Sequence, residues 1–507
     1  NKLASDLNLI HKTNFSLRFW KILIDPWLLY YLEGMYTRWE TINKIIKTEK
    51  NLNFIYFNNL DCFDAPFDVK EYGFYIRSSD VYNQLIFQRI IDFFVKNKQN
   101  ENFYLTHSNE KIIEELNFLQ ENKETNYVNK IYNFFFKKFY RKNKFFLDLN
   151  SIGFNFLFLN LKLKQIPFKD TDFFTNKNYN KLFENRSVSN LEIRKKIIFN
   201  ATKENSFENF LSDNISNDIP KSLIEDFFTI LKFVESIPYK PKTIVSDSSH
   251  YHDTIFKFWV ANCVKNESKL LTSIHGGSLG TISTNHYYEE DISNAVIRWH
   301  KPTMKHCVQL PALPLINHAT RIKQEKRKYL LTIGFEVPHY PFHIFISPIS
   351  GQSLYQIEHL SSFYENLNIK IKNNFIFKPY VNKSSGENFW NFEKRLENIF
   401  KKKTISNTKK YRNLFNKSKI VICTYPKTAF CEAMISGPTI LLYKSNYWKN
   451  SEDFKLLNEK LKKAKILFED PVLAAKHINQ VWEDIDGWWE SSDAKIARES
   501  FLKEVAS

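Results

Sequence analysis

One short stretch gathers glycines directly behind a histidine. The chain has 507 residues but only 11 glycines, and Gly276, Gly277 and Gly280 all follow His275 closely. Glycine permits positive φ and lets backbone N–H groups approach an anion. A histidine at this point can act as a general base or donate to a phosphate. We therefore assign His275 to catalysis and Gly276, Gly277 and Ser278 to ligand binding. The alternative is a turn that requires glycine, with His275 in a packing role.

A second stretch, residues 424–432, suits an anion as well. It reads TYPKTAFCE, so a strand ends, a polar turn follows and a helix opens near Thr428. Free N–H groups at a helix start favour phosphate, and Lys427 adds positive charge. Glu432 lies one helical turn further on, where a carboxylate can accept hydrogen bonds from ribose hydroxyls. The alternative has Thr428 as an N-cap and Glu432 on the surface. The residues assigned to this site are Tyr425, Lys427, Thr428, Glu432 and, at another strand end, Lys378.

Three acidic residues, Glu289, Glu290 and Asp291, come shortly after the glycine turn. Neighbouring carboxylates beside a basic cleft are candidates for a general base. We assign Glu290 first, and then Asp291, to catalysis together with His275. The alternative is a charge cluster on a solvated loop.

Polar residues also close the predicted strand 242–248. Asp247 ends this strand, and His250 and His252 follow it, which makes them a candidate third wall of the site. Together with Asp253 the two histidines have the residue types of a metal site but no specific ligand spacing. We expect no bound metal and no cofactor.

Short apolar runs alternate with helical segments in the middle and last thirds of the chain. The predicted strands are 242–248, 269–277, 294–300, 328–337, 373–380, 419–425 and 438–443. The predicted helices are 251–266, 352–366, 387–401 and 428–437. This alternation indicates an α/β fold with parallel sheets covered on both faces. Ligands of such sheets bind beyond the carboxyl ends of the strands, which is where both stretches lie.

The first 235 residues are predicted to be mostly helical, including 81–98 and 125–142. The segment 15–46 has apolar residues at helical spacing and is expected to break at Pro26. We favour a buried helical pair here. The alternative is a helix on a membrane surface, which the residues Trp20, Trp27, Trp39, Arg18 and Arg38 would suit.

The composition is that of a globular chain with an excess of basic residues. Lys and Arg number 72 against 55 Asp and Glu, a net charge of +17, which attracts phosphates or anionic lipid unless it reflects codon bias alone. No run approaches the roughly 18 apolar residues that span a membrane, and no signal peptide is recognised. The five cysteines form no CxxC pair, which favours a reducing cytoplasm over disulfides or zinc.

Several motifs together resemble one family. They are RFWKILIDPWLLYYLEGMYTRWETI near the N-terminus, Pro220 with Glu225, HGGSLG with EED and a tryptophan in the middle, and TYPKTAFCEAMISGPTILLY near the C-terminus. The chain is similar over nearly its whole length to the transferases of bacterial O-antigen and surface-carbohydrate loci, the Leptospira-type family.

The resemblance implies a GT-B-like glycosyltransferase with two Rossmann-like lobes and a helical N-terminal region. Its second lobe would hold a nucleotide-sugar donor, because Thr428 and Glu432 match the family's Thr-x-x-x-Glu helix start. Its first lobe would hold a glycan or lipid-linked glycan acceptor, with His275 where such enzymes place a base or phosphate ligand. The expected partners include no nucleic acid. The expected location is the cytoplasm, with peripheral contact at the inner membrane as the alternative.

The expected organisation follows from this resemblance and from the predicted elements. Residues 1–235 form the helical region and part of the acceptor lobe, and 236–320 form that lobe's Rossmann-like core. Residues 321–475 form the nucleotide-sugar lobe, and the helices of 476–507 pack back across the lobes. The chain departs from the family at Ile274, Leu279, Asn294 and Arg298-Trp299-His300. Asn294 stands where the family has Asp, which leaves Glu290 as an alternative base.

Three functions remain open at this point. The first is a glycosyltransferase that uses a CMP-activated ulosonic or nonulosonic acid in lipopolysaccharide or surface polysaccharide synthesis. The donor is inferred from the association of such sugars with these loci. The second is a CDP-polyol phosphotransferase, and the third is a non-catalytic carbohydrate-binding protein.

Overall fold

The computed structural model describes most of the chain and divides it into two compact units. The described residues are 1–49, 51–58, 64–96, 103–110, 142–149, 155–167, 186–199, 206–274, 276, 284–299, 306–310, 327–344, 348, 351–380, 389–400, 412–448 and 450–506. One unit comprises Asn1–Thr272 and Asn285–Asn294, and the other Ser273–Thr284 and Ala295–Ser507. Most of the helix expected at 125–142 lies outside the described residues.

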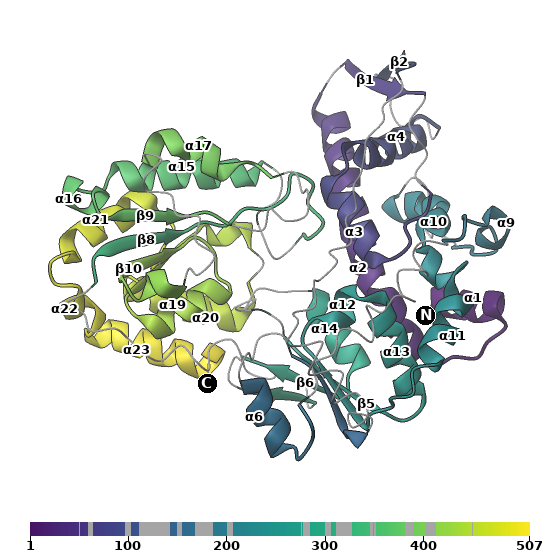
Figure 1. Ribbon diagram of the computed structural model, residues 1–507. Helices are drawn as coiled ribbons and strands as arrows, with labels where there is room; N and C mark the ends of the chain where they lie inside the picture. The colour runs from purple at the N-terminus through teal and green to yellow at the C-terminus, as the bar shows by residue number, and fades with distance from the viewer. Residues whose placement is uncertain are drawn as a thin grey trace. The chain divides into compact units, whose positions relative to one another are not determined.

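The elements follow the predicted alternation (Figure 1). The strands are β1 Leu52–Phe57, β2 Phe103–Ser108, β3 Phe145–Asp148, β4 Thr243–Ser246, β5 Lys269–Ser273, β6 Ala295–Arg298, β7 Cys307–Gln309, β8 Tyr329–Ile333, β9 Phe375–Lys378, β10 Ser418–Cys423, β11 Thr439–Leu442 and β12 Leu467–Phe468. The helices before β8 are α1 Lys2–His11, α2 Leu17–Thr48, α3 Val69–Ser78, α4 Asp80–Lys96, α6 Asn155–Lys162, α9 Leu191–Arg194, α10 Phe207–Asp218, η2 Lys221–Leu223, α11 Phe227–Glu235, α12 Ser249–His252, α13 Thr254–Lys265 and α14 Thr284–Ile292. The helices after it are α15 Gln352–Glu365, α16 Ile369–Lys372, α17 Phe392–Phe400, α18 Arg412–Phe415, α19 Thr428–Ser436, η7 Ser445–Tyr447, α20 Glu452–Lys463, α21 Pro471–Val481, α22 Ile485–Trp489, α23 Ser492–Phe501 and the π-helical η8 Leu502–Ala506.

The second unit contains a parallel sheet whose two faces are both buried. Its strand order is β12-β11-β10-β8-β9, and its paired strands are parallel. Successive residues of β10 alternate between two cores, because Ile420 and Ile422 pack beneath α15, α17 and α21, whereas Val421 and Cys423 pack against α19, α20 and α23. Figure 1 shows α15 and α17 on one side of this sheet and α19 and α23 on the other.

A second five-stranded sheet has the order β3-β4-β5-β6-β7, and β1 and β2 form a separate parallel pair. Within it the pairs β3–β4, β4–β5 and β6–β7 are parallel. The predicted class, an α/β protein with two parallel sheets and a helical N-terminal region, is confirmed. The described cysteines, Cys263, Cys307, Cys423 and Cys431, are buried and free.

The expected break at Pro26 is wrong, because α2 runs unbroken from Leu17 to Thr48 with Pro26 inside it. Proline cannot donate to the carbonyl four residues earlier, which is that of Ile22. The Tyr288 hydroxyl of α14 lies 3.3 Å from this oxygen and 3.0 Å from the carbonyl oxygen of His250. The single hydrogen of this hydroxyl is shared between the two carbonyl oxygens, so a remote side chain offers a donor to the acceptor that the proline leaves without one.

The aromatic residues of α2 form a core rather than a membrane-facing surface. Trp20 is 0% exposed and Trp27 is 1% exposed. Arg38, also buried, donates to Asn83 and to the carbonyl of Ile76. The membrane-surface alternative for this segment is therefore wrong. Among the described residues, no helix is long and apolar enough to cross a membrane.

The contact between α14 and α2 makes a testable prediction. Tyr288→Phe should lower the free energy of unfolding by about 1–3 kcal/mol, because it leaves buried carbonyl oxygens without their donor. In a Pro26→Ala background the backbone N–H of the residue at position 26 can donate to the carbonyl oxygen of Ile22. Tyr288→Phe should therefore lower the free energy of unfolding by less in that background. Urea unfolding of the four proteins in this cycle measures the difference. Equal losses in both backgrounds would contradict the assignment.

Candidate functional site

The strand order of the second unit identifies the edge at which ligands of doubly wound sheets bind. The chain passes from β8 outward to β9 and then returns to the other side of β8 to form β10. Ligands of doubly wound sheets bind beyond the carboxyl ends of the strands at such a reversal. Thr424 joins the two strand ends there, because its hydroxyl donates to the carbonyl oxygen of Ile333 at 2.9 Å.

Helix α19 begins at this edge directly after β10. Its N-cap is Lys427, whose side chain makes no capping hydrogen bond, and Thr428 is the first helical residue. The alternative that made Thr428 an N-cap is therefore wrong. The first N–H groups of a helix have no intrahelical acceptors, so this helix start can receive an anion.

Lys427 places a positive charge beside the start of α19. Its ammonium lies 5.4 Å from the centre of the Phe335 ring and 5.5 Å from that of Trp448, and Tyr425 stacks on Phe335 at 4.6 Å. Burial lowers the pKa of Lys427 to about 8. No carboxylate forms a salt bridge with it in the described part of the chain. An anionic ligand would supply the missing countercharge.

Glu432 is buried in the first turns of α19, with an exposed fraction of 1%. The alternative that placed it on the surface is wrong. Gly276 belongs to the same unit as α19, and a Cβ atom built on Gly276 would lie 3.3 Å from the Thr428 hydroxyl. The structure thus brings one residue of the glycine stretch next to the helix start, at a position where a side chain would be crowded.

Lys378 ends β9 at the same edge of the sheet. Its ammonium donates to the carbonyl oxygen of Pro379 at 3.1 Å, and burial lowers its pKa. Gly334, which follows β8, donates its N–H to the carbonyl oxygen of Lys378. A Cβ atom on Gly334 would lie 2.7 Å from the Phe377 ring, so this glycine is required by packing.

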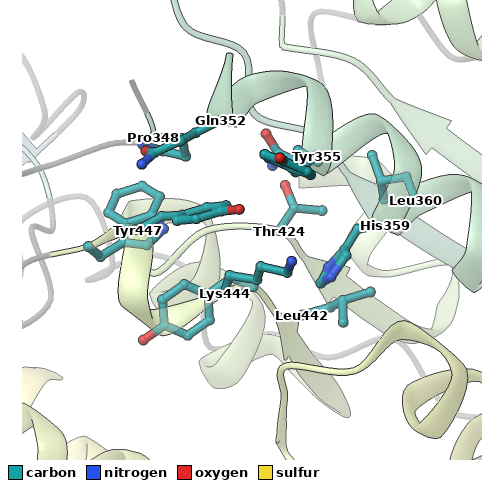
Figure 2. A pocket seen from close by; sticks show the side chains of 12 residues that line it. Pro348, Gln352, Tyr355, His359, Leu360, Thr424, Leu442, Lys444 and Tyr447 are labelled. Atoms are coloured by element: carbon teal, nitrogen blue, oxygen red, sulfur yellow. The ribbon is translucent and has the colours of Figure 1, made fainter. Parts of the chain in front are cut away.

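A pocket opens at the carboxyl ends of β10 and β11 (Figure 2). Its lining residues are Pro348, Gln352, Tyr355, Gln356, His359, Leu360, Thr424, Leu442, Tyr443, Lys444, Tyr447 and Trp448. Of these, Thr424, Leu442 and Tyr443 lie in the C-terminal motif that the sequence singled out, and only Thr424 lies in the stretch assigned to anion binding. Lys444 follows the predicted strand 438–443, so the rule that identified Thr424 at a strand end could have found it. The residues of α15 carried no comparable signal.

The acidic group of the other unit lies on helix α14 and not on a solvated loop, so that alternative is wrong. Glu289 is 0% exposed and Glu290 is 7% exposed. The Asp291 carboxylate is half exposed and pairs with the Lys21 ammonium of α2. Glu290 is the member of this group that combines near-complete burial with a position beside the Glu289 network.

That network is a chain of buried polar groups beyond β3 and β4. The Asp148 carboxylate accepts from Ser246 at 2.6 Å, and the Ser246 hydroxyl lies 2.9 Å from Nδ1 of His250. Nε2 of His250 lies 3.6 Å from the Glu289 carboxylate, which also accepts from the Tyr251 hydroxyl at 2.5 Å. The polar groups after the strand 242–248 are therefore joined to the acidic helix.

The remaining residues of the weak metal-site alternative have structural partners. Asp253 caps α13 by accepting from the N–H of Phe256 at 2.9 Å, and burial raises its pKa to about 6. The ring of His252 stacks on Tyr30. Among the residues that the structure describes, no group of three or more His, Cys, Asp or Glu side chains is placed to hold a metal ion.

Asn294, the main departure from the family pattern, has a bracing role. Its amide oxygen accepts from Arg18 at 2.7 Å and from the N–H of Leu270 at 2.9 Å. Asn294 directly precedes β6, and Leu270 lies near the start of β5, so both are at the amino ends of their strands. An amide oxygen accepts these bonds as a carboxylate would, and the change to Asn lies away from the edge where ligands bind.

Three residues of the proposed site, His275, Gly277 and Ser278, lie outside the described residues. Glu225, part of the family pattern, forms a buried ion pair with Arg194 through two 2.8 Å hydrogen bonds. Arg194 also donates to the carbonyl oxygen of Ile219. This motif therefore stabilises the helical region.

The fold defines a doubly wound α/β protein with a helix start at the carboxyl edge of a parallel sheet, beside a lysine whose pKa is lowered by burial. All of residues 1–507 match the model described as LIC12162 family transferase. The chain belongs to this family of transferases, which confirms the resemblance at the level of the family. No curated protein sequence matches the chain.

Solved structures are similar to the chain only at a distant level. One is a protein assigned as a UDP-N-acetylglucosamine 2-epimerase from Listeria monocytogenes, with 10% identity, a TM-score of 0.33 and coverage of 63% of this chain and 80% of that one. Another is described as trehalose-6-phosphate from E. coli bound with UDP-2-fluoro glucose, with 9% identity, a TM-score of 0.31 and coverage of 55% of this chain and 74% of that one. A third is WaaG, described as a glycosyltransferase involved in lipopolysaccharide biosynthesis. It has 10% identity, a TM-score of 0.27 and coverage of 55% of this chain and 90% of that one.

Lys427→Met should weaken the binding of a nucleotide by about 10- to 100-fold at pH 7, because it removes a charged donor from a phosphate. The wild-type lysine is charged below its pKa of about 8, and a bound phosphate favours that charged form. Wild-type affinity should therefore fall as pH rises from 7 to 9, and the affinity of the variant should stay nearly constant. Calorimetric titration with CMP measures both effects.

Lys455, which is exposed on α20, provides the control for this prediction. Lys455→Met should bind CMP as the wild type does at every pH. Equal affinities of the wild type and Lys427→Met at pH 7 would show that Lys427 does not bind phosphate.

Proposed function

We propose that the protein is a glycosyltransferase that moves a sugar from a nucleotide donor to a glycan or lipid-linked glycan acceptor. The observation that carries this proposal is the start of α19, where the Lys427 ammonium and the positive end of the helix dipole stand at the carboxyl edge of the sheet. Membership of a transferase family supports it. The product would be a lipopolysaccharide or another surface polysaccharide.

The donor site would use the residues of the second unit in distinct roles. Lys427 and the N–H groups of α19 would bind the donor phosphate, and Glu432 would accept from the ribose hydroxyls. Gly276 would leave room beside Thr428. Tyr425 and Lys378 would complete the site, Tyr425 through its stack on Phe335.

The chemistry would be displacement at the anomeric carbon of the donor sugar. A base, either His275 or a carboxylate of α14, takes the proton of an acceptor hydroxyl, and the oxygen forms the new bond to the anomeric carbon. The bond from that carbon to the phosphate oxygen breaks, and the electron pair leaves with the nucleotide. Positive charge at Lys427 and the helix dipole of α19 would stabilise the departing phosphate.

For the donor we propose a CMP-activated ulosonic or nonulosonic acid. The chain's net charge of +17 and the basic lining of the pocket beyond β10 and β11 support an acidic sugar.

Thermal melting with CMP, CDP, UDP and GDP should show the largest stabilisation by CMP, because a bound ligand stabilises the folded state in proportion to its affinity. Purified protein should then release CMP from a CMP-sugar, and release should increase with acceptor. Activity with UDP- or GDP-hexoses alone would contradict the CMP donor. Transfer of labelled donor phosphate to the acceptor would show a polyol-phosphate transferase instead.

Glu290→Gln should reduce turnover by about 10²- to 10⁴-fold if this carboxylate is the base, while leaving the affinity for CMP within twofold of wild type. His275→Ala tests the other base in the same way. Glu192→Gln, at an exposed surface position, serves as the control. If neither Glu290→Gln nor His275→Ala changes the rate of sugar transfer, both base assignments are wrong.

A further inference from the structure

The pocket beyond β10 and β11 carries positive charge without a countercharge in its wall. Lys444 and His359 are its ionisable basic residues, and none of its lining residues is acidic. No carboxylate of the described chain forms a salt bridge with Lys444. Figure 2 shows the Lys444 side chain reaching toward His359 below Thr424.

Aromatic rings fix the position of this charge without neutralising it. The Lys444 ammonium lies 5.4 Å from the centre of the Tyr355 ring and 5.7 Å from that of Tyr447. Such contacts orient a cation but leave its net charge available to a ligand. The charge also acts on its neighbour, because burial and then Lys444 lower the pKa of His359, against weaker opposite effects of Asp470 and Glu358.

The lining of the pocket suits a sugar ring. Tyr355 and Tyr447 contact each other, with their ring centres 6.3 Å apart, and both contribute to the pocket wall. Gln352 and Gln356 from α15 add amide groups to the same wall. A pocket with aromatic walls and a few placed polar groups binds a small ligand in one orientation, and a hydroxylated ring offers both an apolar face and hydrogen-bonding groups.

The pocket adjoins the phosphate site within one unit. Trp448 lines the pocket, and its ring also contacts the ammonium of Lys427 at 5.5 Å. Thr424 lines the pocket as well and begins the turn that leads to Lys427. A donor with its phosphate at the start of α19 can therefore extend its sugar toward Lys444.

We propose that this pocket binds the carboxylate of an acidic donor sugar, and that Lys444 and His359 determine the preference for acidic over neutral sugars. The proposal rests on the proposed function, because it assumes a nucleotide donor at Lys427. It adds the place where the sugar's carboxylate binds and two specificity residues that would contact it. A second phosphate of the donor would present the same negative charge, so the test must separate a carboxylate from a phosphate.

The test compares two donors that differ by one negative charge, CMP-N-acetylneuraminate and its carboxyl methyl ester. The wild type should bind the acid about 10- to 100-fold more tightly than the ester, as expected for a charge-assisted hydrogen bond. Lys444→Met should lose this preference and keep its affinity for CMP within twofold. His359→Gln should reduce the preference, and Lys444→Arg should retain most of it.

Two controls keep folding and nucleotide binding separate from the pocket. Melting temperatures of the variants should match the wild type, and Lys455→Met should behave as the wild type does. Saturation-transfer NMR with free N-acetylneuraminate and its methyl ester examines the pocket without a nucleotide. The acid should bind to the wild type and not to Lys444→Met, even if CMP fails to bind and the proposed function is wrong.

Two results would overturn the proposal. If Lys444→Met weakens CDP binding and leaves the acid-to-ester ratio unchanged, the pocket binds a second phosphate. If the wild type binds the free acid and its ester equally, and likewise the two donors, the pocket does not recognise a carboxylate.

Discussion

Burial of both faces of the sheet β12-β11-β10-β8-β9 is the constraint on which the candidate donor site depends. Neighbouring residues of β10 enter different cores, so the strand interior has no place for an ionised side chain. Polar groups can emerge only where strands end. Thr424, Lys427 and Lys444 all lie just beyond strands, at the edge where the order of β8 and β10 reverses. The same packing that stabilises the unit therefore places its candidate ligand-binding residues together at the carboxyl edge of the sheet.

The first unit solves a related problem with a buried polar network. Asp148, Ser246, His250 and Glu289 lie next to one another in series: Asp148 and Ser246 end β3 and β4, His250 follows β4 on α12, and Glu289 lies on α14. Buried polar groups are stable only when they are paired, so each member limits the positions of the next. Glu290 follows Glu289 on α14, so the contacts of Glu289 also limit the position of Glu290.

The sequence predicted the strands well where their apolar residues are continuous. The expected strand 438–443 is β11 Thr439–Leu442, and the expected helix 428–437 is α19 Thr428–Ser436, because local pattern and tertiary burial agree there. It failed at Pro26, since the donor that satisfies Ile22 lies 266 positions away. It also missed Lys444, whose setting is made by Tyr355 of α15. Contacts between remote segments leave no local pattern, and the alternative that placed Glu432 on the surface failed for the same reason.

Helix α14 contacts the first part of α2 through several polar side chains. Arg18 donates to the carbonyl oxygen of Ile292 at 2.8 Å, Lys21 pairs with Asp291, and Tyr288 reaches Ile22. These anchors fall within little more than one turn of a helix of 32 residues, which is about 48 Å long at 1.5 Å per residue. Further along, α2 also packs against α3, α4 and α13, and Arg38 donates to Asn83 and to the carbonyl oxygen of Ile76. The helix that supports α14, and with it Glu290, is therefore itself held along its length by the core of the helical region.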